Sequence, residues 1–272
     1  MESISKSASF KNCTTYTPPL YNEQTLIEYL KLHNLLFARW IDNFDCGYET
    51  EWYHVIKDEP FDITALKAKR RYEINKGLKN YRIQIINPKQ YTLDLYKIII
   101  AAYSSYPRKY RPKLNKTDFF TSIESWSTSD IIVLGAFDRL SSHICGFVIL
   151  INHEEYISYS VHKVMPSEEK KGINAALVFG VMEYFNKSNN YKYVTDGERA
   201  IRHETQFQDY LMKYFGFRRA YCRLKIVYNP YVKAIVYLLY PFRKVIYRFN
   251  SINFLHNIYS VLEQERIRRS FL

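Results

Sequence analysis

The apolar positions of this chain follow two periods, and the change from one to the other marks its most informative segment. From Ile144 to Val161 the chain is largely apolar and rich in β-formers, which indicates strands. From Ala175 to Phe185 apolar residues recur at helical spacing. Gly172 stands at the entrance of that helix. The pattern therefore predicts a strand, a short loop and a helix that begins beside a glycine.

The same two periods predict the elements on either side. Asn87-Pro88 and the proline-broken stretch 106–116 indicate breaks between elements. From Tyr231 the chain becomes a helical, apolar and basic tail, with a kink expected at Pro241. We expect helices at 25–37, 63–78, 91–103, 118–126, 174–186 and 206–214, and strands at 81–86, 131–137, 145–151, 156–164, 192–195 and 218–227.

A strand that runs through a glycine-containing loop into a helix can bind an anion. The N–H groups of a helix's first turn have no partner within the helix, and the helix dipole adds partial positive charge there. A glycine lets a phosphate come close to the backbone. The alternative is an ordinary buried helix that connects two strands, because such units are common.

The spacing within this loop resembles the acyl-CoA-binding core of the GNAT acyltransferase superfamily. Val164, Pro166 and Gly172 stand at its V-x-P-x5-G positions, and Gly216-Phe217 closes a later helix. The resemblance implies a mixed, mostly antiparallel central sheet flanked by helices, over roughly residues 81–228. It also implies acyl-CoA, such as acetyl-CoA, as co-substrate, with its pyrophosphate held by the loop. The implied binding residues are Val164, Lys170, Lys171, Gly172, Ile173, Asn174 and Ala175.

The loop departs from the family pattern at two positions. Glu169 stands where Arg or Gln is usual, and Asn174 replaces the usual second Gly or Ala. The first weakens the attraction for a phosphate, and the second narrows the approach to the backbone. Both leave room for a different acyl donor.

Residues outside the core resemble a subgroup, the Fem-type peptidyltransferases and related cell-envelope acyltransferases of bacteria. The segments that carry this likeness are 70–77 (RRYEINKG) and 215–218 (FGFR). We accordingly expect a disordered lead-in at 1–20, an N-terminal extension at 21–80, the acyltransferase domain at 81–228 and a helical tail at 229–272. The subgroup also offers an alternative donor, aminoacyl-tRNA, whose phosphates the basic segment 67–79 would contact.

Candidate catalytic groups cluster after the strand at 192–195. Glu198 and His203 are the predicted general bases for an acceptor amine, because ligand clefts form at this end of a strand in open sheets. The alternative is a solvated salt-bridge cluster. The strand at 156–164 is expected to polarise the acyl carbonyl through a backbone N–H near Val161–Lys163, and His162 there is either a base or a packing residue.

The general acid of the predicted reaction has no residue at the family's position. The resemblance implies a tyrosine that protonates the departing thiolate, but Met212 occupies that place. Tyr221 is the replacement we predict. The basic, aromatic loop that contains Arg108, Tyr110 and Arg111 is expected to bind the acceptor, unless it is simply solvated.

Composition changes this picture little. The formal charge of +12 favours acidic partners such as phosphorylated cofactors, tRNA or an anionic membrane, without choosing among them. The four cysteines are far apart and lack metal-ligand spacing, so we expect reduced thiols, no metal and a cytoplasmic protein. The tail leaves two possibilities open: its apolar stripe packs on the protein core, or it lies on the inner face of an anionic membrane near its acceptor.

Overall fold

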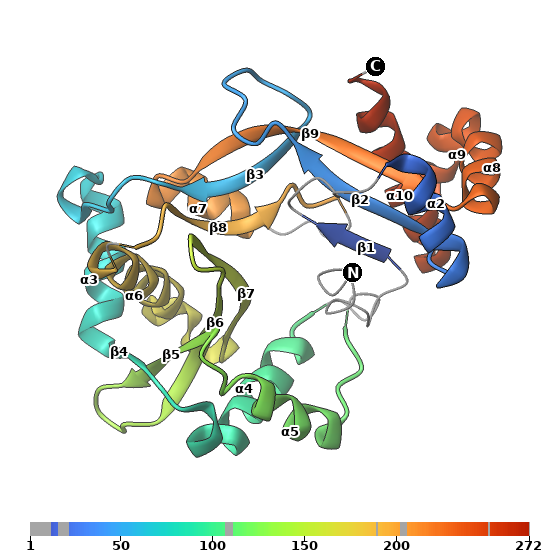
Figure 1. Ribbon diagram of the computed structural model, residues 1–272. Helices are drawn as coiled ribbons and strands as arrows, with labels where there is room; N and C mark the ends of the chain where they lie inside the picture. Colours follow the sequence, from blue (N-terminus) through green and yellow to red (C-terminus); the bar gives the residue numbers. More distant parts are fainter. Residues whose placement is uncertain are drawn as a thin grey trace. The chain divides into compact units, whose positions relative to one another are not determined.

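The structure, a computed structural model, describes residues 12–15, 22–106, 111–188, 190–201, 206–249 and 251–271. Its chain forms two compact units that interleave along the sequence (Figure 1). The first consists of Met1–His54, Glu198–Gln206 and Arg219–Leu272, and the second of Val55–Gly197 and Phe207–Arg218. The domain boundaries expected from the sequence describe contiguous segments, whereas each of these units is assembled from separated ones.

The second unit is built on a sheet in the order β8-β7-β6-β5-β4. Neighbouring strands are antiparallel except β7 and β8, which run parallel. Strand β3 (Trp52–Lys57) passes from the first unit into this one. The strands of the sheet are β4 (Tyr81–Ile85), β5 (Ile131–Asp138), β6 (Ile144–Asn152), β7 (Tyr156–Val164) and β8 (Tyr193–Glu198).

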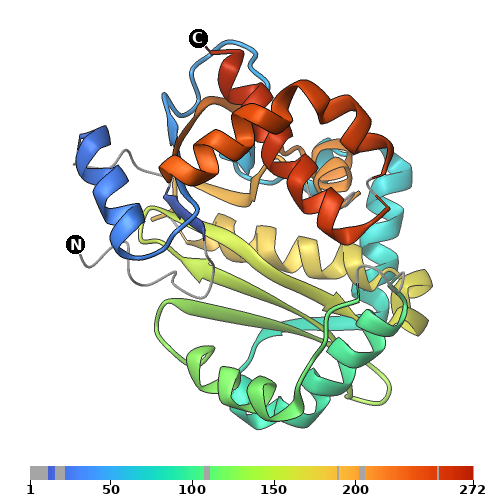
Figure 2. The same ribbon diagram turned by 90° about the vertical axis from the view of Figure 1, so that its right-hand side faces the viewer.

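Helices cover both faces of this sheet (Figure 2). Helices α4 (Thr92–Ser104) and α5 (Lys116–Ser125) bury Leu95, Ile98 and Phe119 against β5 and β6 on one face. Helix α6 (Ile173–Lys187) covers the other face, with α3 (Ala68–Asn80) beside it. The remaining elements of the unit are the short 3-10 helices η1 (Ile63–Ala65), η2 (Pro88–Tyr91) and η4 (Pro166–Lys171), and α7 (Phe207–Phe215).

The first unit also has helices on both faces of its strands. Strand β2 (Phe37–Asp42) pairs in parallel with β1 (Asn12–Thr15) and antiparallel with β9 (Arg218–Tyr228). Helix α2 (Glu23–Leu32) packs on Ala38 and Val227, which point to one face. The tail packs on the other face as α8 (Pro230–Leu239), η5 (Tyr240–Phe242), α9 (Arg243–Arg248) and α10 (Asn253–Arg269).

The observed architecture confirms the predicted fold class, a mixed and mostly antiparallel sheet flanked by helices with a helical tail. The predicted kink at Pro241 is confirmed too, since η5 separates α8 from α9. Of the predicted lead-in, the structure describes only β1. Within the described residues no helix combines the length and the hydrophobicity needed to cross a bilayer.

Two helix predictions were too long, and three strands were missed, namely β1, which lies in the expected lead-in, β2 and β3. The helix expected at 25–37 ends at Leu32, because Asn34 takes a left-handed conformation with φ of 52°. The helix expected from Ile63 begins as the single 3-10 turn η1 and becomes α-helical only at Ala68. Strand β3 escaped prediction because its buried polar residues His54 and Lys57 interrupt the apolar alternation.

Candidate active site around strand β7

The predicted phosphate loop has the expected backbone form. Strand β7 ends at Val164, η4 forms one 3-10 stretch, and Gly172 then turns the chain with φ of 87° into α6. Few L-residues tolerate this left-handed conformation, so the turn itself explains the glycine. The first turn of α6 therefore starts where the spacing of the sequence placed it.

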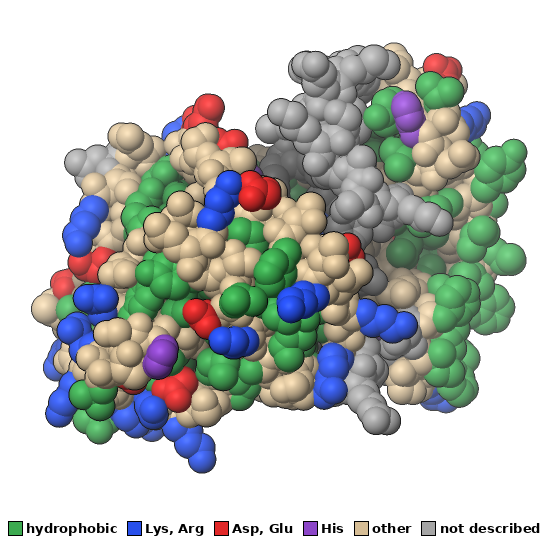
Figure 3. All heavy atoms as spheres, turned by 90° about the horizontal axis from the view of Figure 1, so that it is seen from below, with side chains coloured by type: hydrophobic (Ala, Val, Ile, Leu, Met, Phe, Trp, Pro, Cys, Tyr) green, Lys and Arg blue, Asp and Glu red, His purple; other side chains and the backbone are tan. Residues whose placement is uncertain are grey.

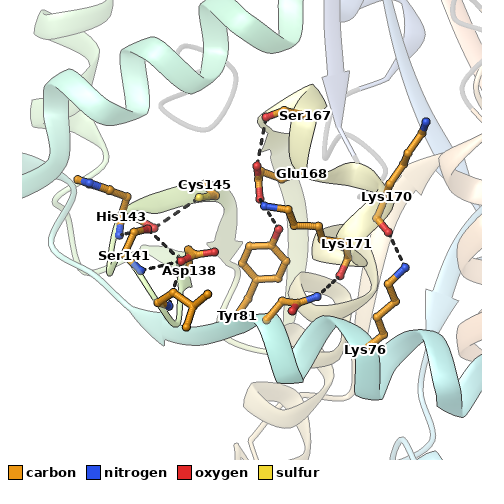
Figure 4. A network of polar contacts seen from close by, with 12 residues as sticks. Lys76, Tyr81, Asp138, Ser141, His143, Cys145, Ser167, Glu168, Lys170 and Lys171 are labelled. Atoms are coloured by element: carbon orange, nitrogen blue, oxygen red, sulfur yellow. Dashed lines mark hydrogen bonds and ion pairs between the residues drawn. The ribbon is translucent and has the colours of Figure 1, made fainter.

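Helix α3 packs on this loop, and two of its side chains donate hydrogen bonds to carbonyl groups of the loop (Figure 4). Lys76 Nζ donates to the Lys170 carbonyl at 2.8 Å, and Asn80 Nδ2 donates to the Lys171 carbonyl at 3.0 Å. A Cβ atom added to Gly172 would lie 3.0 Å from the Gly77 backbone nitrogen. Gly172 thus has a packing role against α3 that is independent of any phosphate.

The negative charge of Glu168, in the loop, is partly neutralised by its neighbours. Tyr81 Oη donates to Glu168 at 2.6 Å and Lys171 Nζ lies 2.9 Å from the same carboxylate, and these contacts lower the pKa of Glu168 (Figure 4). Lys170 is exposed and keeps its charge available to a ligand. The side chains of Val164, Ile173 and Ala175 are buried, so only their backbone atoms can serve a cofactor.

Strands β7 and β8 separate beyond their first residues. They pair only from Tyr156 with Tyr193 to Ser158 with Thr195, although both strands continue. On its other side β7 is bulged: Tyr159 pairs with Leu150 and Val161 with Ile149, which leaves Ser160 unpaired. A bulge shifts the alternation of side chains by one residue. Tyr159 and His162 therefore face the same side, where strict alternation would have placed them on opposite sides.

Both side chains meet α7 at its first residue. The Phe207 ring lies 5.6 Å from the Tyr159 ring and 5.0 Å from the His162 ring, measured between centroids. Tyr210, one turn further along α7, stacks on Phe207 at 6.2 Å. We call Tyr159, His162, Asp196, Phe207 and Tyr210 the β7–α7 cluster. It lies at the part of β7 where the pairing with β8 has ended.

The β7–α7 cluster contains two buried polar atoms without a hydrogen-bond partner among the described residues, Tyr159 Oη and His162 Nδ1. The other ring nitrogen, His162 Nε2, lies 3.0 Å from Asn174 Oδ1. An amide oxygen only accepts, so Nε2 carries the proton and Nδ1 is left as an acceptor. Buried polar groups are nearly always bonded, and unsatisfied ones mark places where a ligand or water binds.

Burial sets the protonation states of these groups. Desolvation lowers the pKa of His162 to about 4, so the imidazole is neutral at pH 7. Burial raises the pKa of Tyr159 well above its ordinary value, so its hydroxyl stays a donor. Burial also raises the pKa of Asp196 to about 7, with a hydrogen bond from Gln208 opposing the shift. The β7–α7 cluster thus offers a proton acceptor, a donor and an acid that titrates near neutrality.

The His162 shift predicts how stability depends on pH. The unfolded chain takes up a proton near pH 6.5 and the folded one only near pH 4, so the free energy of unfolding falls as pH falls through that window. From pH 7 to pH 5 the contribution of His162 to this loss is about 2 kcal/mol. His54, whose pKa burial also lowers to about 4, contributes separately, so urea unfolding at both pH values is compared between the variants and the unaltered protein. His162→Asn should reduce the loss by the His162 contribution, exposed His143→Asn should not, and an equal loss in both variants would contradict the assignment.

The predicted general bases and acid are placed as follows. Glu198 lies in the first unit, where Arg39 Nη2 is 3.1 Å from its Oε2 and burial raises its pKa. Tyr221, in the same unit, sets its ring edge-on to Tyr53 at 6.1 Å, and its carbonyl accepts from the Cys46 N–H. His203 lies outside the described residues. Their catalytic roles stay predictions.

The predicted acceptor loop is described only in part. Arg108 and Tyr110 lie outside the described residues. Arg111 is exposed and donates through Nη2 to the Ser104 carbonyl at 2.5 Å and the Tyr106 carbonyl at 3.2 Å, so it caps the end of α4. Lys163 of β7 approaches the same end, with its Nζ 3.0 Å from Tyr106 Oη. Lys163 was not expected there.

Tyr159 and Asp196 were missed as site residues because the sequence carries no local sign of them. The bulge at Ser160 decides which side Tyr159 faces, and nothing in the YISYSVHKV string marks it. Asp196 belongs to the ionisable cluster after the strand at 192–195, for which solvation was the alternative; in the structure it is half-buried, and Gln208 of α7 donates to its carbonyl. The one available signal was His162 itself, a titratable residue within the predicted strand beside the phosphate loop.

Comparison with known proteins finds solved structures of similar fold but no matching sequence family. No protein-family model and no curated protein matches the sequence. Among solved structures, FemX matches 84% of this chain and 84% of its own with a TM-score of 0.61 at 6% identity. The C-terminal domain of an Agrobacterium fabrum protein assigned as a lysylphosphatidylglycerol synthetase matches 84% of this chain and 81% of its own, with a TM-score of 0.53 at 10% identity.

A third solved structure is a conserved protein of unknown function from Bacteroides thetaiotaomicron. It matches 79% of this chain and 78% of its own, with a TM-score of 0.52 at 13% identity. At these identities the likeness concerns the fold. The chain shares its fold with FemX and with the synthetase domain, in line with the resemblance that its loop and the segments 70–77 and 215–218 carry.

Proposed function

We propose that this protein is an acyltransferase in which an acceptor amine attacks an activated acyl group directly, at the β7–α7 cluster. The observation that carries the proposal is the pair of buried, unsatisfied atoms, Tyr159 Oη and His162 Nδ1, on one side of a bulged strand. Acyl transfer needs a proton acceptor for the amine and a donor for the developing oxyanion. These two atoms supply one of each.

The roles follow from the protonation states. His162 Nδ1 accepts the proton that the amine nitrogen loses as it bonds to the acyl carbon, while Asn174 holds the ring through Nε2. The Tyr159 hydroxyl donates to the carbonyl oxygen as negative charge develops on it. The bond from the acyl carbon to the donor's leaving group then breaks, and the proton on the imidazolium can return to that group.

Acyl-CoA is the donor that we propose first, with an acetyl group as its simplest form. The loop supports it, because the turn at Gly172 leads into the N-terminus of α6 and the exposed Lys170 adds positive charge. The acceptor we propose is an amine of a small cell-envelope or polysaccharide precursor, in keeping with the Fem-type resemblance.

Aminoacyl-tRNA is a second candidate donor, favoured by the outer face of α3. Lys69, Tyr72, Lys76 and Lys79 are exposed there at helical spacing, and no acidic residue lies in that stripe. Phosphates of a nucleic acid would meet cations along this face, and Tyr72 could stack on a base. The hydrogen bonds from α3 to the loop carbonyls are compatible with aminoacyl-tRNA as well as with acyl-CoA.

A thermal-shift panel tests the donor. A ligand at a hundred times its dissociation constant stabilises the fold by about 2.7 kcal/mol, or about 5–10 °C for a protein of this size. We expect this shift with CoA and acetyl-CoA, and its loss in Lys170→Glu. Lys187→Glu, at the other end of α6, is the matched control and should keep the shift.

The same panel separates the two donors. If CoA compounds give no shift while tRNA binds, and Lys69→Glu and Lys79→Glu each reduce the salt dependence of that binding by about one ion, aminoacyl-tRNA is the donor. An absence of both responses would contradict the proposed function, since an acyltransferase must bind a donor.

A further inference from the structure

Helices α8 and α9 expose apolar side chains on the side that does not face the protein core. Val236 of α8 is buried, and Val232 and Leu239 pack with it against the strands of the first unit. On the same helix Tyr231 is 80% exposed, Ile235 56% and Leu238 70%. These three residues recur at intervals of four and three, so they form one stripe. A helix that is apolar all round is normally buried on every side, and this one is covered on one side only.

The exposed stripe continues beyond α8. Phe242 in η5, Val245 and Phe249 at α9, and Ile252 and Phe254 at the start of α10 are each more than half exposed. Hydrophobic side chains gather along the right-hand edge of Figure 3, over this part of the molecule. We call the surface made by Tyr231, Ile235, Leu238, Phe242, Val245, Phe249, Ile252 and Phe254 the tail face.

The charge around the tail face has one sign. Between Asn229 and Leu262 the sequence contains no Asp and no Glu. The same segment contains Lys233, Arg243, Lys244 and Arg248, of which Lys233, Lys244 and Arg248 are exposed. Arg243 lies over the Tyr240 ring at 4.5 Å, within the same surface. Within this segment, apolar and aromatic side chains are thus accompanied by cations and by no acidic residue.

We propose that the tail face binds the surface of an anionic lipid bilayer. Large apolar surfaces bordered by polar residues mark interaction sites, and aromatic residues with Lys and Arg suit the boundary between headgroups and acyl chains. Each Lys or Arg near an anionic leaflet strengthens binding about fivefold. A second copy of this chain fits the face less well, because the segment that forms the face carries cations and no acidic residue to pair with them.

The orientation on the bilayer follows from the packing. Val232, Val236, Leu239 and Ile246 hold the helices to the first unit, so α8 and α9 lie in the interface plane while the core stays outside it. Neither helix crosses the bilayer: α8 spans Pro230–Leu239 and α9 Arg243–Arg248, each too short to do so. The tail face thus serves as an anchor that is independent of donor and acceptor binding.

Sedimentation of the full chain with vesicles tests the proposal. We expect binding to vesicles of phosphatidylcholine mixed with phosphatidylglycerol, and little to phosphatidylcholine alone. Lys244→Gln with Arg248→Gln should weaken binding about thirty-fold, and high salt should do likewise. Leu238→Asp with Phe242→Asp should abolish it. Leu140→Asp is the matched control, because Leu140 is 98% exposed on a turn of the second unit, and it should bind like the unaltered protein.

Three results would overturn the proposal. The first is equal binding to neutral and anionic vesicles, and the second is full binding by the Leu238→Asp/Phe242→Asp variant. The third is a dimer in gel filtration that this variant dissolves, in a protein that no vesicle sediments, since a second copy would then cover the tail face. All the substituted side chains are exposed, and the lysine–arginine pair gives an independent result if the aspartates disturb folding. None of these measurements uses a donor, so they stand apart from the test of the acyltransferase.

Discussion

Replacing His162 by glutamine should lower the rate of acyl transfer about 10²–10⁴-fold, while donor binding stays nearly unchanged. Glutamine can keep a hydrogen bond to Asn174, but it has no lone pair that can take a proton from an amine at neutral pH. Turnover is measured as release of the donor's leaving group, for example free thiol from acetyl-CoA, with an amine that the enzyme accepts. Donor affinity is measured separately by thermal shift.

The variants around His162 sharpen this test. Tyr159→Phe keeps the ring against Phe207 and removes only the hydroxyl, so we expect a loss of about 10²-fold with little change in melting temperature. In the unaltered enzyme the acid limb of the pH–rate profile should fall near pH 4, where the pKa of His162 lies, and not near 6.5.

Glu198→Gln gives the competing outcome. Glu198 is ion-paired with Arg39, so we expect a change in stability with little effect on turnover. If Glu198→Gln abolishes turnover while His162→Gln retains it, the base predicted from the sequence is correct and the β7–α7 cluster is a structural feature.

The sequence was sufficient for those parts of the fold that repeat a single period. The apolar run of β6 and the helical spacing of α6 each follow one period, so the pattern shows them directly. The loop was predictable for a different reason: a left-handed turn requires glycine, and Gly172 supplies it at the mouth of the helix. Local chemistry determined both features.

The site residues could not be obtained in this way because they depend on departures from a period. Ser160 is an extra residue in β7, and it reverses the side on which His162 lies relative to Tyr159. Asp196 is polar by sequence, and its partial burial beside Gln208 of α7 depends on the tertiary structure. In the same way, the role of Gly77 depends on α3 crossing α6, a contact between segments about a hundred residues apart.

Substituting Gly77 by valine should destabilise the protein by about 3 kcal/mol or more, and so lower its melting temperature by roughly 6–12 °C. A Cβ atom at Gly77 would overlap the Gly172 carbonyl oxygen and would lie 3.0 Å from the Ala176 Cβ. Gly172 and Ala176 belong to the backbone at the start of α6, so neither can move aside as the end of a flexible side chain could. Removing a glycine from a helix interior recovers up to about 1 kcal/mol of helix propensity, which is smaller than the clash.

Asn75→Val is the matched control, because Asn75 is exposed on the same helix and receives the same side chain. It should change the melting temperature by less than 2 °C, since its expected free-energy change is within about 0.5 kcal/mol. Gly172→Ala approaches the same contact from the other side, where φ of 87° adds backbone strain, and should also destabilise. If Gly77→Val melts like Asn75→Val, then α3 does not press on the loop. The loop backbone would then be open to a phosphate from that side, and acyl-CoA would gain over aminoacyl-tRNA as the donor.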